Sequence, residues 1–79
     1  MPRYFFHLLE TSDTVFDEEG RELASLEMAR QQALVYARDI MAAEVLDGRI
    51  PLAPVIHIER YDGLERLEVP FSEAVQVSA

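Results

Sequence analysis

The chain has 79 residues, a formal net charge of −8 and no cysteine. This length predicts a single domain over residues 1–79 with a thin core, and the lack of cysteine excludes disulfides, thiolate zinc sites and cysteine nucleophiles. All seven basic residues are arginines, which excludes Schiff-base lysines and phosphate-loop lysines as well.

The negative net charge and the apolar pattern of the sequence also indicate which partners and which location to expect. Nucleic-acid binding depends on neutralising phosphates, and the arginines are scattered, so we expect that the chain binds no nucleic acid on its own. No segment approaches the ~18 consecutive apolar residues of a membrane span, and the N-terminal stretch lacks the apolar core of a signal peptide. We therefore expect a cytoplasmic protein with no membrane partner and no cofactor.

The first predicted element is a strand over residues 3–9, which is rich in aromatic side chains. Its two faces are both apolar, as is typical of a strand in the middle of a sheet. One face carries Tyr4, Phe6 and Leu8, and the other carries Phe5 and Leu9 around His7. A second short strand is predicted over residues 15–18, and Asp17 and Gly20 suit the first and fourth positions of a type I turn.

A long helix is predicted over residues 26–46. Ser25 is a suitable N-cap, no helix breaker follows it, and Gly48 suits the left-handed position that ends a helix. One stripe at helical spacing predicts the buried face of the helix. That stripe consists of Leu26, Ala29, Ala33, Ala37 and Ile40.

The last third predicts a hairpin of strands 55–60 and 65–71 around an Asp-Gly turn at residues 62–63. This turn sets the register, and every resulting pair is either apolar with apolar or opposite in charge. The predicted pairs are Ile58 with Leu67, Ile56 with Val69, His57 with Glu68, Glu59 with Arg66 and Arg60 with Glu65. We expect the tail, residues 72–79, to fray.

These elements predict an α+β fold of order β-β-α-β-β. Two hairpins form one antiparallel sheet, and the long helix packs across one face of it.

Three stretches of the N-terminal half resemble a family of short, uncharacterised bacterial proteins. They are PRYFFHLL, DEEGREL and LEMARQQAL, which lie between residues 2 and 34. The family opens with Pro-Arg-Tyr-Phe-Phe, turns at Asp-Glu-Glu-Gly and enters a helix through Leu-Glu-x-Ala-Arg. It is a domain of unknown function, so the resemblance implies a fold and a bacterial cytosolic setting but no activity. In element order the chain is also similar to HicB-type antitoxins, although their glycine and proline pattern before the helix is missing.

One group of polar side chains is a candidate for chemistry. The predicted register places His57, Glu59, Arg66 and Glu68 on one face of the sheet, and His7 can share it. A metal-binding or acid–base role is one hypothesis for these residues. Ordinary cross-strand pairing of His57 with Glu68 and of Glu59 with Arg66 explains the four strand residues without any ligand. We therefore predict no catalytic, cofactor or metal residues.

The remaining candidate is an interaction surface, because one helix covers only one face of a sheet. Its predicted residues are Tyr4, Phe5, Phe6, Leu9, Met28, Val35 and Leu46. We therefore expect a small non-catalytic protein-interaction or regulatory module that forms a homodimer and can bind a further protein. Two alternatives stay open: an antitoxin-like inhibitor of a basic toxin, and a small metal-dependent or hydrolytic enzyme that uses the histidine face.

Overall fold

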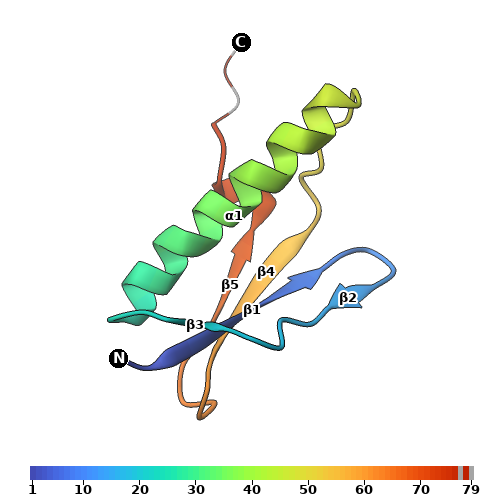
Figure 1. The fold of residues 1–79 in the computed structure, drawn as a ribbon. Helices are drawn as coiled ribbons and strands as arrows, with labels where there is room; N and C mark the ends of the chain where they lie inside the picture. The colour runs from blue at the N-terminus through green and yellow to red at the C-terminus, as the bar shows by residue number, and fades with distance from the viewer. Residues whose placement is uncertain (77, 79) are drawn as a thin grey trace.

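The computed structural model describes residues 1–76 and residue 78, and it confirms the α+β prediction. Five strands form one antiparallel sheet, and one long helix crosses it (Figure 1). The elements in chain order are β1 (Arg3–Leu9), β2 (Thr14–Val15), β3 (Arg21–Glu22), α1 (Leu26–Leu46), β4 (Val55–Arg60), β5 (Arg66–Pro70) and the 3₁₀ turn η1 (Phe71–Glu73).

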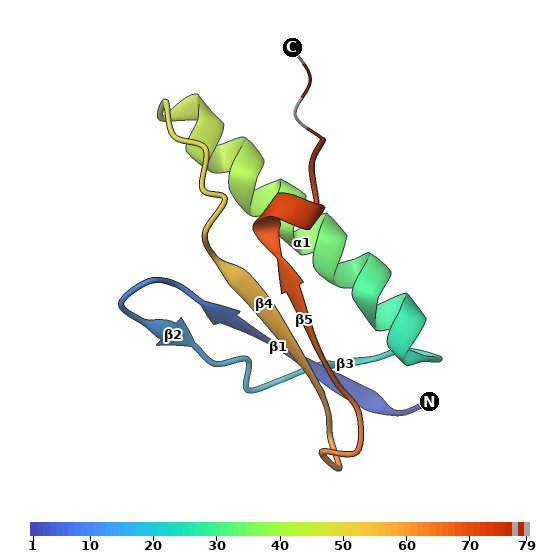
Figure 2. The same ribbon diagram turned by 180° about the vertical axis from the view of Figure 1, so that it is seen from behind.

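The sheet has the order β2-β1-β4-β5, and β3 pairs with β1 as well. Strand β1 therefore lies inside the sheet, as its two apolar faces predicted. The helix lies across one face, and the view from behind shows no element of residues 1–76 over the other face (Figure 2). Within the described residues, α1 lacks the apolar length needed to cross a membrane.

The closing hairpin has the predicted register. Ile58 lies opposite Leu67 and His57 lies opposite Glu68, and the Arg60 N–H donates to the Glu65 carbonyl at 3.0 Å. At the tip, Gly63 has a φ of +74°, a conformation that glycine adopts without strain. The Asp-Gly turn therefore sets the pairing of β4 with β5.

The N-terminal edge differs from the strand predicted over residues 15–18. Pairing of β2 ends at Val15 and resumes at β3, along the same edge of β1. From the Leu8–Val15 pair to the Tyr4–Arg21 pair, β1 spans four residues while the edge segment spans six. The two extra residues form a bulge, which interrupts the ladder at the Asp-Glu-Glu-Gly stretch.

The core lies between α1 and the sheet. Its buried residues are Tyr4, Ala29, Ala33, Leu34, Ala37, Met41, Ile56, Ile58, Val69, Phe71 and Ala74. The three predicted alanines are fully buried, and small side chains let the helix approach the strands closely. Ile40 is instead 37% exposed and Leu26 is half-buried, because the buried face of the helix passes through Leu34 and Met41. The predicted stripe is therefore correct at its alanines and displaced at its ends.

The C-terminal segment packs further than expected. Pro70 ends the last strand, and η1 then turns the chain so that Phe71 and Ala74 are buried. The Arg38 Nε donates to the Ala74 carbonyl at 2.7 Å, which ties this segment to the helix. The packing of Ala74 thus differs from the loose tail expected from residue 72 onward, and residues 77 and 79 of that tail lie outside the described residues.

Candidate functional site

One face of the sheet has no helix against it, and we call it the open face. It consists of Phe5, His7, Leu9, Val55, His57, Glu59, Arg66 and Glu68, with Phe16 beside His7. Alternation along the strands places these side chains together, since successive residues point to opposite faces. A hollow of about 540 Å³ lies on this face between β1, β4 and the β2 edge.

The two histidines form the centre of the open face. His7 lies directly opposite His57 on the neighbouring strand, and their rings stack with centroids 6.2 Å apart. Phe5 stacks on the ring of His7, and Phe16 meets that ring edge-on at 5.4 Å. The Nδ1 of His7 accepts the backbone N–H of Asp17 at 3.1 Å.

The charged residues of the open face lie in the predicted cross-strand pairs. His57 Nδ1 lies 3.9 Å from Glu68, and Arg66 Nε lies 3.7 Å from Glu59. Glu59 also approaches His57 Nε2 at 4.0 Å. Within the described part of the chain, no three His, Cys, Asp or Glu side chains are grouped closely enough to hold a metal ion. The structure thus brings all five candidate polar residues onto one face, where they are arranged as pairs.

We predict that His57→Gln lowers the free energy of unfolding by no more than about 1 kcal/mol, the scale of one cross-strand pair. Urea denaturation of the two proteins measures this difference. A loss of stoichiometric bound zinc in the variant would show instead that His57 is a metal ligand.

Asp17 organises the bulge at the edge of the sheet. Its carboxylate accepts the backbone N–H groups of Phe6, Glu19 and Gly20 at 3.0–3.1 Å. Burial raises the pKa of Asp17, but these three hydrogen bonds together outweigh burial and hold the pKa below its usual value. The sequence predicted a type I turn here. In the structure, the side chain of Asp17 also accepts a strand N–H, that of Phe6, at the point where the bulge interrupts the ladder.

Gly20 completes this bulge with a φ of +71°. A Cβ at this position would lie 2.9 Å from the Tyr4 carbonyl oxygen and 2.9 Å from Arg3 Cγ. The Asp-x-x-Gly spacing of the sequence therefore meets both requirements of the bulge, a carboxylate acceptor and a residue without a side chain.

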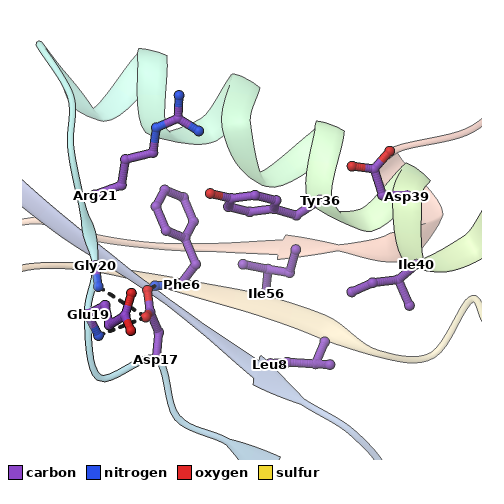
Figure 3. Close-up of a pocket in the computed structure, with 10 residues that line it drawn as sticks. All are labelled: Phe6, Leu8, Asp17, Glu19, Gly20, Arg21, Tyr36, Asp39, Ile40 and Ile56. Atoms are coloured by element: carbon purple, nitrogen blue, oxygen red, sulfur yellow. Dashed lines mark hydrogen bonds between the residues drawn. The ribbon is translucent and has the colours of Figure 1, made fainter.

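A groove of about 410 Å³ separates α1 from this edge, on the helix side of the sheet (Figure 3). We call it the helix–edge groove. Its floor is Phe6, Leu8 and Ile56, its helix wall is Tyr36, Asp39 and Ile40, and its edge wall is Asp17, Glu19, Gly20 and Arg21. The ring of Tyr36 meets Phe6 edge-on at 5.2 Å. Sequence reasoning missed this site, although Tyr36, Asp39 and Ile40 have the i, i+3, i+4 spacing of one helix side.

The residues predicted for an interaction surface are divided by the structure. Phe5 and Leu9 lie on the open face, and Met28, Val35 and Leu46 are exposed on the helix. Tyr4 differs from this prediction, because its ring is buried under the helix and cannot contact a partner. Its hydroxyl donates to Glu65 at 2.9 Å, and burial together with this hydrogen bond raises its pKa. Phe6 also faces the helix, where it is half-buried against the core.

Comparison with known proteins identifies a family. A family model described as a domain of unknown function (DUF6894) matches residues 3–72, and the chain therefore belongs to this family. Neither a curated protein nor a solved structure is significantly similar to the chain.

Proposed function

We propose that this member of the DUF6894 family is a non-catalytic interaction module that forms a homodimer through its open face. The observation that carries the proposal is an apolar and aromatic sheet face that α1 leaves uncovered. In small proteins a contiguous apolar surface of this kind marks a contact site.

The apolar side chains of the open face gather around the two stacked histidines. Phe5, Leu9 and Val55 are half-buried by their neighbours, while Phe16 is 69% exposed. Burial of apolar area contributes roughly 25 cal/mol per Å², and aromatic side chains supply most of that area per residue. A contact between two open faces would remove these rings from water.

The charge of the open face supports a second copy as the occupant. Two glutamates and one arginine, Glu59, Glu68 and Arg66, give it a local charge of −1, whereas the whole chain carries −8. Two such faces therefore repel each other little at contact, and the repulsion that remains acts at long range. Since salt screens long-range repulsion, we expect the dimer to tighten as salt is added.

The outer side of the helix offers a poorer contact. Its exposed apolar residues Met28, Val35 and Leu46 include no aromatic ring, and Leu46 is the last residue of α1. The cross-strand pairing of His57 with Glu68 and Glu59 with Arg66 also supports binding rather than catalysis, because these side chains already have partners.

Sedimentation equilibrium at tens of micromolar protein and moderate salt tests the dimer. We expect a weight-average mass that rises with concentration from the 9.0 kDa of one chain toward twice that value. Association has a large entropic cost, so we expect modest affinity. Phe16→Ser is expected to weaken association about tenfold, because it removes an exposed ring of the contact.

Leu64→Ser is the matched control, because Leu64 is 78% exposed at the hairpin tip, away from the centre of the open face. It is expected to leave the dimer unchanged. A 9.0 kDa species at every concentration, or equal weakening by both substitutions, would contradict the proposal.

A further inference from the structure

We propose that the helix–edge groove binds an extended basic segment of a partner protein. An apolar side chain of that segment would lie on the floor of the groove, and its arginine or lysine residues would face the carboxylates of the walls. This site is on the helix side of the sheet, so its occupation is independent of the open face.

The shape of the site favours an extended segment. A second hollow of about 180 Å³ adjoins the groove and shares Leu8 and Ile40 with it. Its other walls include Glu10, Glu44 and Pro54. The two hollows together follow the second half of the helix, from Tyr36 to Glu44. An extended chain fills such an elongated site better than a compact ligand does.

The floor of the groove supplies apolar contact area. Phe6 and Leu8 are half-buried, and Ile40 on the helix wall is 37% exposed. Figure 3 shows Phe6, Ile56, Leu8 and Ile40 along the space between the helix and the edge of the sheet. One apolar side chain of a partner can therefore pack here and gain free energy by leaving water.

The charges around the two hollows determine which partner fits. Five carboxylates line the two hollows, and they belong to Glu10, Asp17, Glu19, Asp39 and Glu44. The only guanidinium among the described lining residues is that of Arg21. Glu44 already pairs with Arg49 at 2.8 Å, and Asp17 is held by backbone N–H groups. Among the described residues, the side chains of Glu10, Glu19 and Asp39 have no ion pair or hydrogen bond.

This excess of unpaired carboxylates selects a cationic partner. A second copy of the chain, at −8, is repelled by these walls, whereas arginine or lysine residues flanking an apolar side chain complement them. Arg21 and Asp39 stand at opposite ends of the groove, with Tyr36 between them (Figure 3). The cationic side chains are therefore expected at the Asp39 end.

Fluorescence polarisation with two labelled peptides tests the proposal on the full chain. The probe is Arg-Leu-Arg-Leu-Arg-Leu, and the charge-matched control peptide is Arg-Gly-Arg-Gly-Arg-Gly. We expect saturable binding of the leucine probe that weakens with added salt, and binding of the glycine peptide at least tenfold weaker. No saturable binding, or equal affinity for both peptides, would overturn the proposal.

Paired substitutions locate the binding site. Asp39→Asn is expected to lower the affinity for the leucine probe about threefold. Ile40→Ser is expected to lower it about fivefold. The matched controls Glu27→Gln and Val45→Ser make the same kinds of change on exposed parts of α1 outside the groove. Circular dichroism shows whether each variant is folded. Equally large losses of affinity in the two control variants would overturn the assignment of the binding site to the groove.

Amide chemical shifts of the unsubstituted protein give a readout that requires no variant. The leucine probe is expected to shift residues 36–40 and 19–21 and to leave the centre of the open face, at His7 and His57, unchanged. Shifts confined to the open face would overturn the groove as the binding site.

Discussion

Replacement of Phe71 by alanine is expected to lower the free energy of unfolding by about 3–5 kcal/mol. The ring is fully buried, and the Phe71 N–H donates to the Pro54 carbonyl at 2.9 Å. Phe71 thus fills the core where η1 turns toward the helix. Domains of this size are stable by about 4–12 kcal/mol in total, so the expected loss is a large fraction of the stability. Urea denaturation followed by circular dichroism measures it.

Phe16→Ala provides the matched comparison, because it makes the same chemical change at a ring that is 69% exposed. At a protein concentration where the chain is monomeric, we expect it to cost less than about 1 kcal/mol. If Phe71→Ala does not fold, Phe71→Leu retains most of the volume and is expected to cost less. Equal losses for Phe71→Ala and Phe16→Ala would show that Phe71 is not part of the core.

Replacement of Asp17 by asparagine is expected to lower the free energy of unfolding by about 1–3 kcal/mol at pH 7. The carboxylate accepts three backbone N–H groups, and an amide side chain offers one oxygen and turns an NH₂ group toward the other donors. Glu18→Gln is the control in the same turn. Glu18 is exposed, and its substitution is expected to change stability by less than about 0.5 kcal/mol.

The advantage of aspartate at position 17 is expected to depend on pH. The pKa of Asp17 is lowered in the folded state, so the unfolded chain takes up the proton first, near the ordinary aspartate value of about 3.9. The stabilisation is therefore complete above that value and is lost as the pH falls through the lower pKa of the folded state. The difference between the original protein and Asp17→Asn should shrink as the pH falls from 7 to 3. A difference that stays constant or grows on acidification would contradict this role.

The closing hairpin shows what local sequence patterns predict well. Asp62 and Gly63 define a tight turn, and the alternation on either side permits only one register that pairs every side chain favourably. The helix is predictable for a similar reason, because its N-cap at Ser25 and its end before Gly48 depend on neighbours in sequence. Such signals act over a few residues, and no distant contact is needed to interpret them.

The face of β1 that α1 covers was not predictable in this way. Tyr4 and Phe6 on one side and Phe5 and Leu9 on the other are both apolar, so burial of either side has a similar free energy. Packing of the helix against Ile56 and Ile58 of β4 resolves the choice, and Tyr4 is buried as a result. Half of the predicted interaction surface on this strand is therefore core.

The two candidate sites differ in the same respect. Pairing rules were enough to place His57, Glu59, Arg66 and Glu68 on one sheet face, because strand alternation and turn position are local properties of the sequence. The helix–edge groove arises from the angle of α1 across the sheet and from the bulge that Asp17 holds beside β1. Both depend on contacts between segments far apart in the chain, and for that reason only the tertiary structure reveals them.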